Sequence, residues 1–114
     1  MNKRNIIIKE GANEDFLIIC DHASNRIPKE YGNLGMKSGE ILSHRAFDIG
    51  AADVAKELSN RLDCTLIMSN FSRLLIDPNR GTDDPTLIPK LSEDVKIKGN
   101  IDLKNNGKDK ERLK

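Results

Sequence analysis

The chain has 114 residues, enough for one domain of ordinary size, and its 19 basic and 18 acidic residues leave a net charge of +1. With no basic field, three Phe, one Tyr and no Trp, the composition argues against a nucleic-acid-binding protein, because those proteins use positive patches and rings that stack on bases. No apolar run is long enough for a signal peptide or a transmembrane helix, so we expect a soluble, cytoplasmic protein without a membrane partner.

The predicted elements begin with two apolar segments. Residues 6–8 are three isoleucines and predict a short strand, and residues 16–20 are apolar at every position. A strand without polar alternation is usually buried on both faces. We therefore expect the second segment to lie in a sheet that is covered by helices on each side.

The strongest helix prediction covers residues 48–62, after a shorter helical turn at 40–45. Asp48 is its expected N-cap or first-turn acid, and Asp63 is expected to end it. Its apolar face is formed by Ala51, Ala55, Leu58 and Leu62. Strands are predicted at 65–68 and 73–77, and the order strand, strand, helix, strand, strand predicts an α/β fold.

Domain organisation follows from where the apolar residues lie. We expect a single domain over 1–114, with an ordered core at about 5–90 and a polar segment at about 91–114. Residues 96–98 and the charged C-terminus are interpreted as solvated surface. Cys20 and Cys64 each lie in or beside an apolar run, which favours small buried thiols over a disulfide.

The first candidate site is His22, just beyond the predicted strand at 16–20. In α/β enzymes the site lies outside the carboxyl ends of the strands, and an imidazole there can bind zinc or act as a base. Asn25 is three residues further on and could ligate or orient, within a polar group that also holds Ser24 and Arg26. The alternative is a histidine that only hydrogen-bonds a turn.

The second and third candidates combine acidic and basic side chains. His44 and Asp48 are four residues apart and would share a face on one helix, as metal ligands or as ligand and orienting carboxylate. The alternative makes Asp48 a helix cap and His44 a surface residue. In 72–80, Arg73 and the pair Asn79-Arg80 could clamp an anionic substrate, because arginine matches a carboxylate. The alternative is that Asp77 pairs with one arginine and a turn follows.

Taken in order, three motifs resemble the N-formylglutamate amidohydrolase family. They are residues 21–28 (DHASNRIP), 44–51 (HRAFDIGA) and 72–80 (SRLLIDPNR), with further similarity at Pro85, 88–89 and 98–100. The resemblance covers about 16–100. It implies an architecture similar to the zinc carboxypeptidases, which is a mixed sheet between helix layers with the site at the strand ends. It also implies hydrolysis of N-formyl-L-glutamate to formate and glutamate in histidine degradation.

The same resemblance implies roles for individual residues. His22 would bind a divalent metal, expected to be zinc, and Asn25 would stand where the carboxypeptidases have a glutamate ligand. His44 and Asp48 would lie at the site as ligands or beside a ligand. Asn79 and Arg80 would hold the substrate carboxylate, with Arg73, Ser24 and Arg26 as further substrate-binding candidates. The catalytic acid or base has no candidate in this chain.

Family members are longer than this chain, and His22 and His44 are its only histidines. We therefore expect a truncated domain that is inactive alone, or active with a second chain that supplies the rest. Two rival hypotheses are a metal-free module that binds carboxylates and a degenerate gene product that is partly unfolded.

Overall fold

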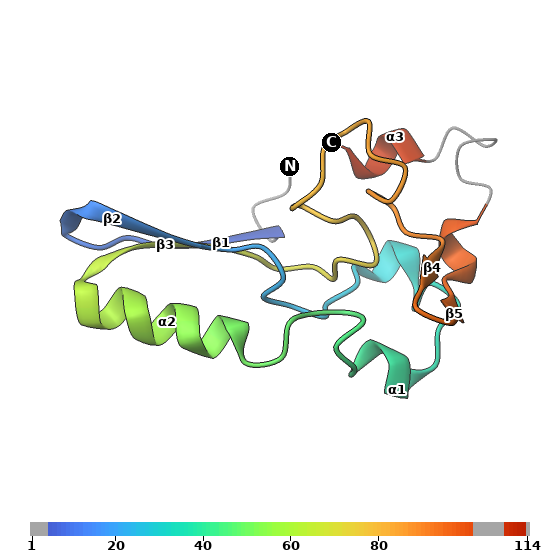
Figure 1. Cartoon of the computed structure of the whole chain (residues 1–114), viewed down its shortest axis with the longest axis horizontal. Helices are drawn as coiled ribbons and strands as arrows, with labels where there is room; N and C mark the ends of the chain where they lie inside the picture. The colour runs from blue at the N-terminus through green and yellow to red at the C-terminus, as the bar shows by residue number, and fades with distance from the viewer. Residues whose placement is uncertain (1–4, 102–108, 114) are drawn as a thin grey trace.

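The computed structural model describes residues 5–101 and 109–113, and its largest regular unit is a three-stranded sheet with one helix. The strands are β1 (Ile6–Lys9), β2 (Asn13–Cys20) and β3 (Cys64–Ser69), and the helix is α2 (Ala51–Leu62). Figure 1 shows this unit at one end of the molecule, with α2 under the sheet. The predictions of a strand at each of the first two apolar segments, a helix ending at Leu62 and a strand at 65–68 are confirmed.

The sheet is mixed, as predicted. Its order is β1-β3-β2, with β1 antiparallel and β2 parallel to β3. The parallel pair is joined by a crossover that contains α2, which is the usual way to connect parallel strands. Both strands of that pair therefore end at the same edge of the sheet.

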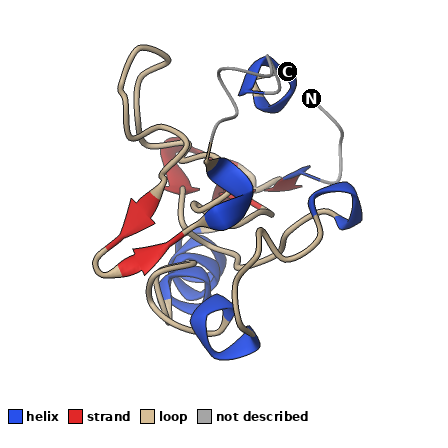
Figure 2. Cartoon of the chain, turned by 90° about the vertical axis from the view of Figure 1, so that its right-hand side faces the viewer, coloured by secondary structure: helices blue, strands red, loops and turns tan. Residues whose placement is uncertain are grey.

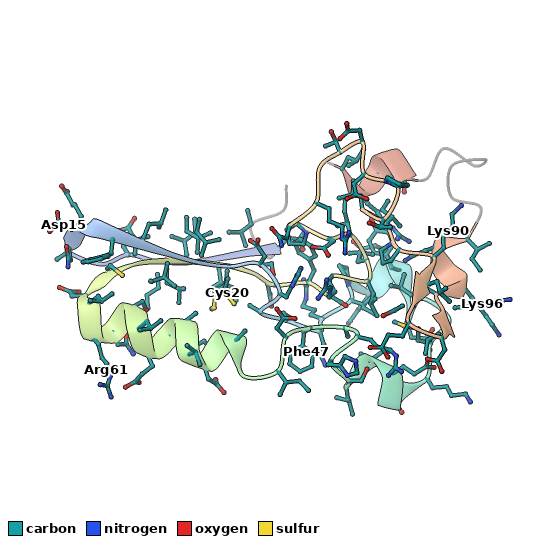
Figure 3. All side chains as sticks on the ribbon, viewed as in Figure 1. Asp15, Cys20, Phe47, Arg61, Lys90 and Lys96 are labelled. Atoms are coloured by element: carbon teal, nitrogen blue, oxygen red, sulfur yellow. The ribbon has the colours of Figure 1, made fainter. Side chains whose placement is uncertain are left out.

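Helix α2 packs against one face of the sheet through small and apolar side chains. Asp63, in the left-handed conformation, ends the helix as predicted. Figure 3 shows Cys20 between the sheet and the helix. Both cysteines are free and buried, as predicted for small buried thiols. This first core consists of Cys20, Ala55, Leu66 and Met68.

The expectation that β2 is buried on both faces is wrong for the described chain. Leu17 and Ile19 pair with Thr65 and Ile67 of β3 on the face opposite α2, and they are 53% and 61% exposed. Among the described residues, α2 covers only one face, so no second helix layer encloses the sheet. The apolar pattern of these residues shows that they are suited to burial, but no described element covers them.

The strand predicted at 73–77 is also wrong. The segment forms consecutive turns, in which Leu75 N–H donates to Ser72 O (3.0 Å) and Arg80 N–H donates to Asp77 O (3.2 Å). Ser72 Oγ donates to Ala46 O (2.8 Å) and accepts from Leu74 N–H (3.2 Å), which fixes the first turn. Leu74 is buried in a core of loops, so the apolar run marks burial without an extended backbone.

That second core lies beyond the sheet and joins loops to three short elements. These are α1 (Ser38–Ile41), which begins two residues before the predicted turn, and the hairpin of β4 (Leu91–Ser92) and β5 (Val95–Lys96). Short 3-10 helices lie at Lys29–Tyr31 and Lys98–Asn100. The buried residues of this second core are Leu34, Met36, Ala46, Phe71, Leu74, Leu75 and Ile97.

Side chains that were expected to be solvated near the C-terminus belong to this second core. Ile97 is 0% exposed, and Arg112 of α3 (Asp109–Arg112) is 8% exposed. Arg112 Nη1 donates to Leu75 O (2.9 Å) and to the side-chain oxygen of Asn100, and its guanidinium lies 4.9 Å from the Tyr31 ring centroid. The expectation of a solvated surface is therefore wrong for these two side chains.

Replacing Arg112 with alanine is expected to lower the free energy of unfolding by about 2 kcal/mol, because a hydrogen-bonding charged side chain is lost and the buried Asn100 oxygen and Leu75 carbonyl lose a donor. Urea unfolding followed by circular dichroism measures the difference. Glu111→Ala is the matched control, since the exposed neighbour should change stability by less than about 0.5 kcal/mol. Equal stability of the two variants would show that the Arg112 contacts contribute nothing.

The two cores lie end to end and make an elongated molecule. Its extents are 46 × 28 × 24 Å, and its radius of gyration is 15.1 Å, against about 13 Å for a compact domain of this length. Figure 2 looks along the long axis, with the β4–β5 hairpin at the near end. Within the described ranges, no helix is long and apolar enough to span a lipid bilayer.

Candidate functional site

The candidate site lies where the sheet meets the second core. His22 follows the C-terminal end of β2, and the turns at 72–80 follow β3. Because these strands are parallel, both segments leave the same edge of the sheet. Asp48 precedes α2, and its backbone N–H donates to His22 O (3.0 Å). Three segments that are far apart in sequence therefore meet at one place.

His22 lies between two carboxylates. Its Nδ1 is 3.2 Å from Asp48 Oδ2, and its Nε2 is 2.7 Å from Asp77 Oδ1. His22 and Asp77 are buried, whereas Asp48 is half exposed. Since an ionised carboxylate only accepts hydrogen bonds, both contacts are hydrogen bonds at the same time only when both ring nitrogens carry protons. The pair of carboxylates fixes the plane of the imidazole.

Asp77 connects the histidine to the arginines. Its Oδ2 accepts from Arg73 Nη2 and from Arg80 Nε, both at 3.2 Å, and its Oδ1 accepts from Asn79 N–H (2.9 Å). Burial alone would raise the pKa of Asp77. The hydrogen bonds from His22 and Asn79 and the charges of His22 and Arg73 lower the pKa by more than burial raises it, so it lies below its ordinary value. In the sequence, Asp77 stands between Arg73 and Arg80, and this bracketing by two arginines is the signal for the ion pairs that the alternative interpretation of 72–80 contains.

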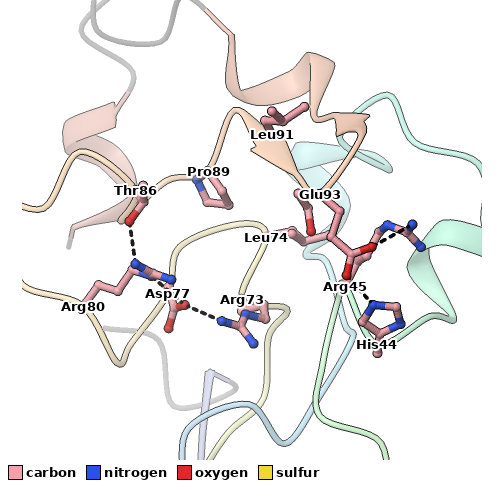
Figure 4. A pocket seen from close by; sticks show the side chains of 11 residues that line it. His44, Arg45, Arg73, Leu74, Asp77, Arg80, Thr86, Pro89, Leu91 and Glu93 are labelled. Carbon is pink, nitrogen blue, oxygen red and sulfur yellow. Dashed lines mark hydrogen bonds and ion pairs between the residues drawn. The ribbon is translucent and has the colours of Figure 1, made fainter.

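A cavity of about 320 Å³ opens beside these groups. Figure 4 shows Arg73, Asp77 and Arg80 on one side of it and Arg45 with Glu93 on the other. The remaining lining residues are His44, Leu74, Thr86, Pro89, Leu91 and Ser92. A pocket that carries arginines at two sides can hold a small ligand with more than one carboxylate.

Each side of the cavity also carries its own acidic groups. Arg80 Nη1 lies 3.7 Å from Asp84 Oδ2 and donates to Thr86 Oγ1 (2.6 Å). Across the cavity, Arg45 Nη2 donates to Glu93 Oε2 (3.2 Å), while its buried Nε has no acceptor in the part of the chain that the structure describes. The hydrogen bond from His44 and the charge of Arg45 lower the pKa of Glu93. Arg45 was not among the candidates from the sequence, although it stands inside the second motif.

The four candidate metal ligands do not come together. His44 is 62% exposed and its Nε2 lies 2.8 Å from Glu93 Oε1, while Asn25 Nδ2 donates to Ile41 O (3.1 Å). The expectation that His44 and Asp48 share a helix face is wrong, because both precede α2 and face different partners. Only Asp48 joins His22.

The described residues contain no group of three or more His, Cys, Asp or Glu side chains that is placed to hold a metal ion. A catalytic zinc site uses three protein ligands and one open position. The donor set present here does not fit the expected zinc.

The remaining candidates lie near the site with other contacts. Ser24 Oγ accepts from Arg26 N–H (3.1 Å), and Arg26 Nη1 donates to Asn70 O (2.9 Å), so both stabilise the segment beside the ends of β2 and β3. Neither residue lines the described cavity. Asn79 is exposed in the turn after Asp77, while Arg73 and Arg80 do line the cavity.

Comparison with known proteins gives the family. The model of the N-formylglutamate amidohydrolase family matches residues 14–112. The crystal structure of gene product Atu2144 from Agrobacterium tumefaciens is 37% identical, with a TM-score of 0.86, and the match covers 97% of this chain and 43% of that one. No curated protein sequence matches the chain. The chain spans less than half of the Agrobacterium chain, and by the extent of the family match it belongs to the N-formylglutamate amidohydrolase family.

Proposed function

We propose that this chain is the substrate-binding part of an amidohydrolase that splits an N-acyl acidic amino acid, with N-formyl-L-glutamate as the first candidate substrate. The observation that carries the proposal is the cavity of about 320 Å³ that is lined by Arg45, Arg73 and Arg80. Family membership supports amide hydrolysis as the reaction. Arginines on both sides of one cavity suit the two carboxylates of N-formyl-L-glutamate.

The described residues account for binding better than for bond cleavage. Arg80 and Arg73 would hold one carboxylate of the substrate, in a position that Asp77 fixes for both guanidinium groups. Arg45 would hold the second carboxylate across the cavity. His22, fixed by Asp48 and Asp77, lies beside the cavity wall and would be the first group of this chain to reach the acyl end.

Cleavage itself needs groups that this set does not provide. The expected zinc would need ligands beyond His22 and Asp48, and no residue here is assigned as the acid that protonates the leaving amine. We therefore propose that the 114 residues form part of a larger domain and that the chain alone binds the substrate without releasing formate.

Calorimetric titration of the purified chain with N-formyl-L-glutamate tests the binding step. Arg80→Gln is expected to weaken binding by about tenfold, because a charge-assisted hydrogen bond to a carboxylate is lost. Arg61→Gln on α2 is the matched control, since its side chain is 76% exposed and does not line the cavity, and it should leave the affinity unchanged. An affinity that Arg80→Gln leaves unaltered would contradict the proposed carboxylate clamp.

A second candidate function is a metal-free module that binds carboxylates, and the separation of His44 and Asn25 from His22 favours it. Metal analysis of the purified chain and a formate-release assay separate the two functions. One bound zinc ion per chain would count against the metal-free module. Formate release by this chain alone would contradict the claim that other groups are required.

A further inference from the structure

The β4–β5 hairpin carries a carboxylate into the proposed binding cavity. Glu93 and Asp94 form the loop between the two strands. Glu93 lines the cavity, whereas Asp94 does not. Figure 4 shows the Glu93 carboxylate between the side chains of Arg45 and His44. The loop therefore places a negative charge where the proposed function places the second carboxylate of the substrate.

The contacts of Glu93 are those that a bound carboxylate would make. Its Oε2 accepts a hydrogen bond from Arg45 Nη2 (3.2 Å), and its Oε1 lies 2.8 Å from His44 Nε2. The side chain of Arg45 is 22% exposed and that of Glu93 is 58% exposed. A largely buried guanidinium is thus paired with a largely exposed carboxylate. A ligand that enters from solvent can replace this carboxylate while the arginine stays in place.

The backbone at Glu93 is in a conformation that favours glycine. Its φ is +54°, in the left-handed region. A first loop residue with positive φ in a tight hairpin is commonly glycine, because a Cβ is strained there. Non-glycine residues in such conformations are concentrated at functional sites. The glutamate side chain at this position therefore calls for a role other than stability of the hairpin.

We propose that Glu93 is an internal competitor for the second carboxylate of the substrate: it occupies Arg45 when the cavity is empty and is displaced when a dicarboxylate binds. The inference rests on the proposed function for the identity of the ligand. An exposed ion pair is weak in water, so a ligand carboxylate can displace Glu93 at modest cost. This cost lowers the affinity for dicarboxylates, whereas a ligand with a neutral group at that place leaves Glu93 on Arg45.

Asp94 allows Glu93 to leave without releasing the arginine. Its Oδ1 also accepts from Arg45 Nη2 (3.3 Å), and it does so from outside the cavity lining. A rotation of the exposed Glu93 side chain is therefore sufficient to free one side of the guanidinium. The opposite role, in which Glu93 holds Arg45 in place for the ligand, predicts that loss of the Glu93 charge weakens binding.

Calorimetric titration with N-formyl-L-glutamate, N-formyl-L-glutamine and glutarate tests the proposal. Glu93→Gln should tighten the binding of both dicarboxylates about fivefold, at the upper end of what an exposed ion pair contributes. N-formyl-L-glutamine has an amide in place of the second carboxylate, so its affinity should change by less than about twofold. Asp94→Asn is the matched control, because it removes the same charge from the same loop and the same arginine. Asp94 is 86% exposed and does not line the cavity, so this variant should change each affinity by less than about twofold.

Glu93→Gly is a second variant, which is expected to fold because glycine tolerates the positive φ, and it should tighten dicarboxylate binding as Glu93→Gln does. Thermal unfolding checks that both variants are folded. Dicarboxylate binding that Glu93→Gln weakens or leaves unaltered would overturn the proposal, as would equal tightening of N-formyl-L-glutamine. Failure of glutarate to bind both the parent and Glu93→Gln would also overturn it. Tighter glutarate binding without any binding of N-formyl-L-glutamate keeps the role of Glu93 and counts only against the proposed substrate.

Discussion

Replacing Gly11 with alanine is expected to lower the free energy of unfolding by about 3 kcal/mol, at the upper end of the usual effect of overpacking. Gly11 lies between β1 and β2, where the chain passes the start of β3. A Cβ at this position would lie 2.4 Å from Cys64 C and 2.5 Å from Asp63 O. Both are backbone atoms, so no side chain can move aside to relieve the contact.

The close approach at Gly11 is held in place by its surroundings. Gly11 N–H donates to Thr65 Oγ1 (3.2 Å), and two residues later Asn13 N–H donates to Asp63 O (2.7 Å). An alanine would have to break these bonds or displace the first residue of the central strand. We therefore expect a fall of about 10–20 °C in the unfolding midpoint, which is measured by circular dichroism.

Gly39→Ala is the matched control for Gly11→Ala. Gly39 lies in α1, and nothing lies within 4 Å of the Cβ position there. Alanine is the better helix former, so this variant should be unchanged or slightly more stable. If the unfolding midpoints of Gly11→Ala and Gly39→Ala differed by less than about 2 °C, the claim that the backbone beside Cys64 leaves no room for a Cβ at position 11 would be wrong.

The sequence predicted the sheet unit well because its signals are local. The periodicity at 51–62 and the apolar runs at 16–20 and 65–68 each describe one element, and all three occur where expected. The prediction at 73–77 failed because a short buried apolar run has no periodicity that separates a strand from turns in a core. The turn is fixed by the hydrogen bond from Ser72 Oγ to Ala46 O, which is 26 residues away. The sequence around residue 72 does not show this contact.

The candidate site was predicted in part for a related reason. His22 lies just beyond the end of β2 as expected, because that strand end can be inferred from the sequence, whereas Arg73 and Arg80 lie in turns after β3 and not along and after the strand predicted at 73–77. Spacing alone placed His44 beside Asp48 on a helix, but the helix begins at Ala51, and the two side chains diverge. The partners of Asp77 are set by tertiary contacts, which a count of residues between two motifs does not reveal.

The face of the sheet opposite α2 separates an apolar sequence pattern from actual burial. The isoleucines of β1 and β2 predict burial, while the described structure leaves them exposed. An apolar run therefore reports surface that is suited to burial, and its burial depends on which other elements lie against the sheet.

Replacing Asp77 with asparagine is expected to lower the free energy of unfolding by about 3 kcal/mol at pH 7, since removal of one member of a buried charge network leaves the others uncompensated. Asp77 is 3% exposed and accepts hydrogen bonds from Arg73, Arg80 and the backbone of Asn79. Asparagine has a similar shape, so the change removes the charge with little effect on packing. Urea unfolding of the two proteins measures the difference.

The pH dependence of that difference identifies the charge as its cause. The pKa of Asp77 is lowered in the folded protein, so its carboxylate stabilises the fold above the unfolded pKa of about 3.9 and loses this effect as the pH falls through the folded value. The gap between parent and Asp77→Asn should therefore be present at neutral pH and close as the pH falls below about 4. Asp94→Asn is the control, because Asp94 also pairs with an arginine but is 86% exposed, and its effect should stay below about 1 kcal/mol. A gap for Asp77→Asn that persists unchanged in acid would show that packing and not charge makes this residue the centre of the site.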